Sequence, residues 1–210
     1  MENTSRILTL IPGFLFGLTL HEFSHAWAAT RLGDPTARRL GRLSLNPLAH
    51  LDLFGSLALI FIGFGWAKPV PVDPNYLRSP RRDMALIAAA GPVSNLLIAI
   101  VLAALARLAL VGSNAIEGSV STGILILVQA VWINIVLAIF NLIPLPPLDG
   151  SRVLAGIVPE TWNHGYEQVE RFGPMILFGV IILASVTGIS ILGRIIMPVA
   201  EPVFRWFMGF

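Results

Sequence analysis

Cysteine is absent from the 210 residues of this chain. Its absence excludes disulfide bonds and every metal site that depends on thiolate ligands. A metal ion bound by this protein would therefore need histidine, aspartate or glutamate as its ligands.

Charged residues are also scarce. They make up 12% of the chain, against 55% hydrophobic residues, and the mean hydropathy is +0.78. This balance indicates a membrane protein, because soluble domains carry about 25% charged residues. The net charge of +2 and the pI near 9.7 do not indicate a nucleic-acid partner, since the basic residues are scattered at the ends of apolar segments. We therefore expect the lipid bilayer as a partner and no nucleic acid.

Long apolar segments predict an all-α polytopic membrane protein, built as a bundle of transmembrane helices. The predicted spans cover residues 7–30, 84–111, 122–142 and 175–192. The apolar run 53–66 is short for a span and contains three glycines, so a re-entrant segment is the better interpretation. The proline-interrupted tail 195–210 could either span the bilayer or lie on its surface.

Basic residues orient these spans, because positive charge beside a span favours the cytoplasm. Residues 31–83 carry eight lysines and arginines, whereas the loop 111–121 carries none. If the run 53–66 does not cross fully, the N-terminus lies outside and the basic region is cytoplasmic. A full crossing would place Lys68 and three arginines outside, so re-entry is favoured.

The sequence HEFSH at 21–25 places three ionisable groups at the end of an apolar run. Charge at this depth is expensive and usually functional. In a helix, His21 and His25 lie one turn apart on the same face and can bind one cation, with Glu22 beside them. Zinc hydrolases use this arrangement. Cleavage of a signal peptide at the small-residue pattern Ala26-Trp27-Ala28 would discard the group, which argues against that alternative.

The third metal ligand is expected from the same, cytoplasmic leaflet. The span 122–142 ends there in FNLIPLPPLDG (140–150), where three prolines break the helix and leave Asp149 on irregular backbone. Such backbone is tolerated at membrane depth only where it is buried in protein or lines a wet cavity. Asp149 is the predicted third ligand. Two nitrogens and one carboxylate oxygen leave a fourth tetrahedral position for water, as catalytic zinc sites require.

With these pieces the chain resembles the site-2 proteases, the zinc intramembrane metalloproteases, in their short prokaryotic form without a PDZ or CBS domain. The matching segments follow the family's order: HEFSH (21–25), GRLSLNPLAHLD (41–52), WAKPVPVDP (66–74), AGPVSN (90–95) and FNLIPLPPLDG (140–150). The resemblance implies a single membrane-embedded metalloprotease domain over 1–210. Its catalytic core would cover about 7–155, and C-terminal helical segments would cover about 156–210.

The resemblance also implies roles for individual residues. His21, His25 and Asp149 would bind one Zn²⁺ per chain, and Glu22 would be the catalytic acid and base. The extended pieces around 37–45 and 66–73 would form small membrane-embedded β-strands.

In the predicted mechanism, Glu22 takes a proton from a zinc-bound water as it attacks the scissile carbonyl, and later returns the proton to the leaving amine. Asn141 and His50 are the candidate donors to the oxyanion that forms in between. Asn141 could instead form a hydrogen bond to a backbone group that lost its helical partner where the prolines break the helix. His50 could be a side chain at the membrane interface. For Asn95, helix packing or hydrogen bonding is the simpler interpretation.

The expected substrates are single-span membrane proteins, cleaved in or near the transmembrane segment in regulated intramembrane proteolysis. A helical substrate must unwind locally, and the proline-rich segment 66–74 could offer an edge with which the extended chain pairs. Two alternatives come from other function classes. A membrane-embedded zinc-binding transporter should show internally repeated halves, which the sequence lacks. A catalytically silent scaffold would have lost part of the catalytic set, but Glu22, both histidines and Asp149 are all present. The sequence does not indicate the oligomeric state.

Overall fold

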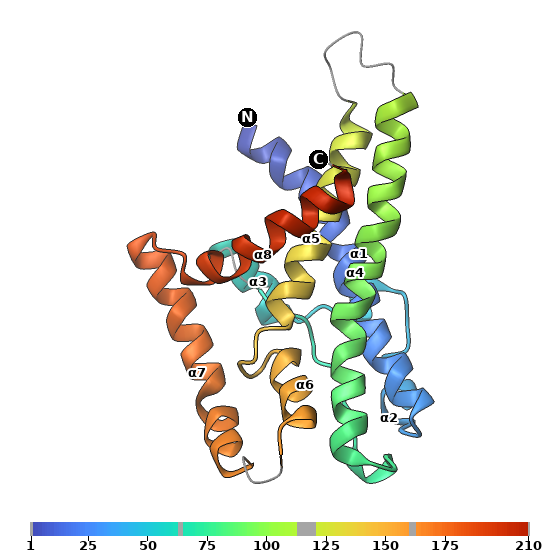
Figure 1. Ribbon diagram of the computed structural model, residues 1–210, viewed down its shortest axis with the longest axis vertical. Helices are drawn as coiled ribbons and strands as arrows, with labels where there is room; N and C mark the ends of the chain where they lie inside the picture. The colour runs from blue at the N-terminus through green and yellow to red at the C-terminus, as the bar shows by residue number, and fades with distance from the viewer. Residues whose placement is uncertain (1, 63–64, 113–120, 160–162, 210) are drawn as a thin grey trace.

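The computed structural model describes residues 2–62, 65–112, 121–159 and 163–209 (Figure 1). Within these residues the chain forms eight α-helices and two short 3-10 helices, with no β-strand. The α-helices are α1 Glu2–Arg31, α2 Thr36–Arg39, α3 Leu53–Ile62, α4 Pro80–Gly112, α5 Thr122–Asn141, α6 Asp149–Ile157, α7 Asn163–Thr187 and α8 Ile191–Met208. The 3-10 helices are η1 Pro47–Ala49 and η2 Pro74–Tyr76. The prediction of a helical membrane protein is confirmed.

Three of the described helical stretches are long and apolar enough to cross a membrane: Pro80–Gly112, Thr122–Asn141 and Val169–Thr187. The first two agree with the predicted spans. The third ends earlier than predicted, because Gly188 takes a left-handed conformation with φ 72° after the last helical residue. For α1, the span predicted over 7–30 stays a prediction.

The helices α1, α4 and α5 pack against one another and form the centre of the molecule (Figure 1). Two glycines of α1 allow α5 to approach closely. A Cβ atom at Gly13 would lie 2.8 Å from the Cα atom of Ala130, and one at Gly17 would lie 2.6 Å from Oδ1 of Asn134. The side chains of α5 therefore lie directly against the backbone of α1, which carries the HEFSH residues.

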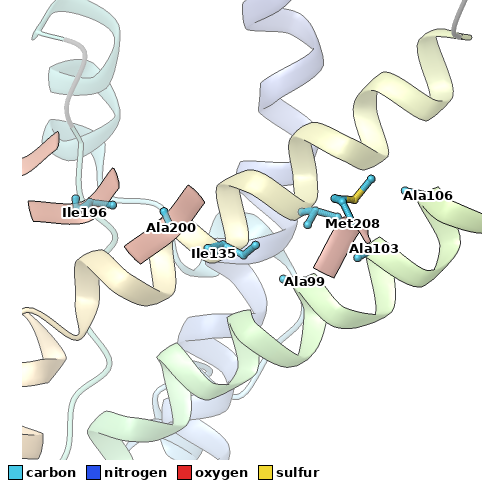
Figure 2. Close-up of a cluster of buried hydrophobic side chains, with 8 residues drawn as sticks. Ala99, Ala103, Ala106, Ile135, Ile196, Ala200 and Met208 are labelled. Carbon is cyan, nitrogen blue, oxygen red and sulfur yellow. The ribbon is translucent and has the colours of Figure 1, made fainter. Parts of the chain in front are cut away.

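A buried apolar cluster joins α4, α5 and α8 (Figure 2). On α4 it consists of Ala99, Ala103 and Ala106, whose spacing places them on one face of the helix. Small side chains on this face let α8 run across α4 and α5, where Ala200 is fully buried. Residues 195–208 of the predicted tail thus belong to α8, a helix packed on the central bundle, and residue 210 lies outside the described residues.

The prediction of β-strands around 37–45 and 66–73 is wrong. Residues Thr36–Arg39 form α2, and the pairing of Leu51 with Ala67 is an isolated bridge within the described residues. Pro69 and Pro71 lack the N–H groups that a continuous ladder would need at their positions, which limits pairing along the second segment.

The segment 66–73 is instead held by residues from the chain between α1 and α3. These contacts are hydrogen bonds to its backbone. The Arg42 guanidinium donates to the carbonyl oxygens of Lys68 and Pro69. The Lys68 N–H donates to the His50 carbonyl, and the Asp73 N–H donates to the Asp34 carboxylate. Side chains and one backbone bond, rather than a neighbouring strand, therefore fix the position of the segment.

The apolar run predicted as re-entrant contains α3, which has 10 residues. Such a helix is about 15 Å long, half the thickness of the hydrocarbon core of a bilayer. The helix is therefore too short to cross the membrane. Residues 63 and 64 of the predicted segment lie outside the described residues, and the re-entrant course stays a prediction.

Candidate metal centre

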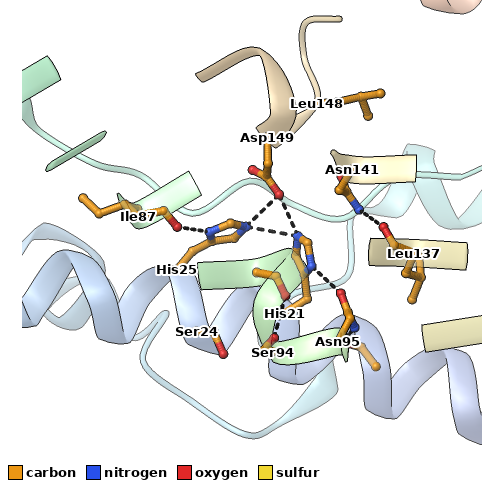
Figure 3. A network of polar contacts seen from close by, with 12 residues as sticks. His21, Ser24, His25, Ile87, Ser94, Asn95, Leu137, Asn141, Leu148 and Asp149 are labelled. Carbon is orange, nitrogen blue, oxygen red and sulfur yellow. Dashed lines mark hydrogen bonds and ion pairs between the residues drawn. The ribbon is translucent and has the colours of Figure 1, made fainter. Parts of the chain in front are cut away.

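The two histidines of HEFSH lie one helical turn apart on α1, and both side chains are buried. Their Nε2 atoms are 3.0 Å apart and face the same point (Figure 3). The helical spacing read from the sequence therefore places the imidazoles as predicted.

Asp149 reaches the same point from α6. The helix α5 ends at Asn141, the prolines turn the chain, and Asp149 is the first residue of α6 rather than part of irregular backbone, which corrects the prediction. A carboxylate is favoured at the N-terminus of a helix. Its Oδ2 atom lies 3.1 Å from Nε2 of His21 and 3.2 Å from Nε2 of His25. The tight turn requires glycine at position 150, because a Cβ atom there would collide with the carbonyl oxygen of Leu142.

The other ring nitrogen of each histidine is bonded to α4. Nδ1 of His25 lies 2.7 Å from the carbonyl oxygen of Ile87, and Nδ1 of His21 lies 2.6 Å from Oδ1 of Asn95 (Figure 3). Oxygens of this kind only accept, so each neutral imidazole carries its hydrogen on Nδ1. Both Nε2 atoms consequently present a lone pair towards Asp149.

Three acceptor atoms thus converge at one buried point. Oδ2 of Asp149 is buried and has no hydrogen-bond partner among the described residues. Acceptors repel one another at such distances unless a cation lies between them. A tetrahedral zinc ion with bonds of about 2.0 Å separates its ligand atoms by about 3.3 Å, close to the spacings of 3.0–3.2 Å found here. The residues present fit zinc.

Gly91 of α4 makes room for this cluster, and the sequence analysis did not single it out. A Cβ atom at this position would lie 2.5 Å from Nε2 of His25 and 2.6 Å from Cε1 of His21. Glycine is therefore required for α4 to pass directly beside the ligand atoms. The segment AGPVSN, matched only by resemblance, acquires a physical role through Gly91 and Asn95.

Glu22 follows His21 on α1 and is 8% exposed. The second residue that the sequence analysis missed is Arg42, which is 5% exposed. Burial lowers the pKa of the Arg42 guanidinium, and the negative charge of Glu22 acts on that pKa in the opposite direction. A cation thus lies within electrostatic reach of the predicted acid and base. The sequence offered one indication of this role, because Arg42 lies in the segment 41–52 that resembles the family.

The two predicted oxyanion donors form their hydrogen bonds with backbone carbonyls outside the cluster. Nε2 of His50 bonds to the Ser44 carbonyl at 2.7 Å, and Nδ1 of His50 is buried without a partner among the described residues. Nδ2 of Asn141 donates to the Leu137 carbonyl at 3.0 Å, one turn back in α5 (Figure 3). The structure thus brings together His21, His25 and Asp149, while the catalytic roles of His50 and Asn141 stay predictions.

Comparison with known proteins identifies a family and several relatives of this chain. Residues 9–184 match Peptidase family M50. A Bacillus subtilis (strain 168) protein named "Putative zinc metalloprotease YwhC" is 42% identical over 171 residues, which cover 80% of this chain and 75% of that protein. No solved structure matches the chain.

Two mycobacterial proteins with the same description, both named Rip2, are more distant. The protein of Mycolicibacterium smegmatis (strain ATCC 700084 / mc(2)155) is 34% identical over 160 residues, covering 73% of this chain and 59% of its own length. The protein of Mycobacterium tuberculosis (strain ATCC 35801 / TMC 107 / Erdman) is 29% identical over 207 residues, covering 95% of this chain and 70% of its own length. The matched family covers most of the chain, including all three residues of the buried cluster, and the chain therefore belongs to peptidase family M50, the zinc-dependent site-2 proteases of membranes.

Proposed function

We propose that His21, His25 and Asp149 hold the zinc ion of this M50 protease and that Glu22 transfers protons during peptide-bond hydrolysis. One observation carries the assignment: two imidazole lone pairs and one buried carboxylate oxygen, drawn from α1 and α6, converge within 3.2 Å of one another. A cation between them stabilises such a set of acceptors, and two nitrogens with one oxygen are a ligand set of catalytic zinc.

Zinc bound at this point would lower the pKa of a water molecule and polarise the scissile carbonyl. The residues of the chain perform the remaining steps. Glu22 takes a proton from the attacking water and returns it to the amine that leaves. Arg42 is buried within electrostatic reach of Glu22 and places a positive charge beside this part of the site.

Hydrogen bonds to the oxyanion come from Asn141 and His50 in this proposal. His50 has a buried Nδ1 atom that lacks a partner among the described residues. It would donate to the oxyanion only when both ring nitrogens carry a hydrogen, because Nε2 already donates to the Ser44 carbonyl. Asn141 would exchange its bond to the Leu137 carbonyl for one to the substrate.

Site-2 proteases act on membrane proteins within the bilayer. We propose single-span proteins as the substrates of this chain, unwound locally and paired with segment 66–73. The backbone N–H and carbonyl groups of Val70 and Val72 make no hydrogen bond within the described residues, whereas Lys68 and Asp73 on either side are bonded to the protein. An extended peptide would find its main-chain partners at these two valines.

The proposed orientation places the N-terminus outside and the catalytic site near the cytoplasmic leaflet. The basic residues between 31 and 83 support it, together with α3, which is too short to cross the bilayer. We propose that the segment 53–66 is re-entrant and that residues 1–210 form one domain.

The decisive experiment compares the native protein with Glu22→Gln on single-span reporter proteins in liposomes, with zinc measured on both. We expect equal zinc in both and no cleavage by the variant, because the substitution removes the proton acceptor and no metal ligand. Cleavage by Glu22→Gln at the native rate would refute the mechanism. A transporter or a silent scaffold is not favoured, because the chain belongs to a peptidase family and keeps the full set of His, Glu and Asp residues.

A further inference from the structure

The two histidines are held in different ways on their Nδ1 side. His25 bonds to a backbone carbonyl, that of Ile87, which no substitution removes. His21 bonds to the side chain of Asn95. The orientation of His21 therefore depends on which end of the Asn95 amide faces it, because an amide turned by 180° would present an NH₂ group instead of an oxygen.

The backbone of α1 decides the orientation of Asn95. Its Nδ2 atom lies 3.1 Å from the carbonyl oxygen of Gly17, an atom that only accepts. The reversed amide would bring two oxygens together there, and would offer an N–H donor to Nδ1 of His21. Nε2 of His21 would then carry the hydrogen and lose the lone pair that points at Asp149. The Gly17 carbonyl thus selects the tautomer of His21 through Asn95.

Asn134 of α5 extends the same chain of bonds. Its Oδ1 atom accepts a second hydrogen from Nδ2 of Asn95 at 2.9 Å, and its own Nδ2 atom donates to the Ala130 carbonyl at 2.8 Å. The Ala130 carbonyl fixes this amide just as the Gly17 carbonyl fixes that of Asn95. Both asparagines are completely buried. Both hydrogens of the Asn95 amide and one of the Asn134 amide have acceptors, which makes this arrangement more stable than its alternatives.

We propose that Asn95 and Asn134 are positioning residues of the metal centre. Together they hold His21 with its hydrogen on Nδ1 and its Nε2 lone pair directed at the metal, and they connect the metal centre to the contact between α1 and α5. The proposal rests on the proposed zinc site. It also assigns a purpose to Gly17, since any Cβ atom there would press on the Asn134 amide.

The test measures zinc affinity in purified protein by competition with a chelator, at one pH and far below the unfolding temperature. Asn95→Leu should weaken zinc binding by about 10-fold to 100-fold, the range for a residue that orients a metal ligand. Asn134→Leu should weaken it less, because the Gly17 carbonyl still orients Asn95. Gln129→Leu on the same helix is the matched control, since its buried Oε1 atom has no partner among the described residues. Its zinc affinity should equal that of the native protein.

A conservative variant separates positioning from helix packing. Asn95→Asp keeps an acceptor for the His21 N–H, so it should bind zinc more tightly than Asn95→Leu. If the asparagines served packing alone, leucine would be tolerated better than a buried carboxyl group and the order would reverse. Unfolding temperatures of the metal-free variants identify any general loss of stability. If Asn95→Leu does not fold, Asn95→Asp and Asn134→Leu carry the comparison.

Equal zinc affinity in the native protein, Asn95→Leu and Asn134→Leu would overturn the proposal, as would a lower affinity in Asn95→Asp than in Asn95→Leu. His21→Ala distinguishes this outcome from failure of the proposed function. Zinc lost in His21→Ala but unaffected by the asparagine variants would refute only the positioning role. Zinc retained in His21→Ala would refute the metal site itself.

Discussion

Gly91→Ala is the perturbation whose effect follows most directly from the structure. The added Cβ atom would lie 2.5 Å from Nε2 of His25 and 2.6 Å from Nε2 of His21, where ordinary contacts begin at 3.4 Å. The two ligand atoms would have to move by about 0.9 Å, whereas ligand distances in metal sites vary by about 0.2 Å. Overpacking of this kind costs about 1–3 kcal/mol. If this cost falls on metal binding, zinc affinity drops roughly 5-fold to 150-fold.

The assay combines chelator competition for zinc with cleavage of a reporter at saturating zinc. Cleavage should fall by about 100-fold even with zinc supplied, because a displacement of about 1 Å at a catalytic centre has that effect. Gly112→Ala is the matched control at the end of the same helix, since its Cβ atom would meet nothing within 4 Å. Native zinc affinity and activity in Gly91→Ala would refute the arrangement of α1, α4 and the ligand atoms described here.

Three further substitutions test the site and the segment beside it. Asp149→Ala removes the only carboxylate of the His21, His25 and Asp149 cluster, so zinc should be lost on dialysis against a weak chelator; full retention would exclude Asp149 as a ligand. Arg42→Met removes the two bonds to the carbonyls of segment 66–73 and should reduce cleavage roughly 10-fold to 100-fold while the zinc content stays native; unchanged cleavage would show that the anchoring is dispensable. Val70→Pro removes an N–H group proposed to bind substrate and should impair cleavage without changing zinc content, and loss of zinc would instead indicate a global folding defect.

The membrane helices were predictable because their signal is local. A run of apolar residues long enough to cross a bilayer is visible in any window of the sequence, and 84–111 and 122–142 agree with α4 and α5 within a few residues. The end of α7 was missed because one glycine, Gly188, ends the helix inside an apolar run. Hydropathy does not register such a conformational stop.

The strands were mispredicted for the opposite reason. Alternating and proline-rich segments indicate extended backbone, but a strand exists only where a neighbour pairs with it. Around 66–73 the neighbours are Arg42, His50 and Asp34, whose contribution depends on how the chain between α1 and α3 folds back. No local pattern carries that information.

The sequence by itself determined that this protein lies in a membrane, that two histidines share one helical face, and that the carboxylate expected to join them follows the broken helix near residue 149. These conclusions need only periodicity, hydropathy and the chemistry of the side chains. Only the tertiary structure decided that Gly91 leaves room for the two imidazoles, that Arg42 is buried within electrostatic reach of Glu22, and that Asn95 lies between His21, Gly17 and Asn134. Each of these roles is a contact between residues on different helices or far apart in the chain. Such contacts follow from how the segments pack, and no single segment carries a pattern that records them.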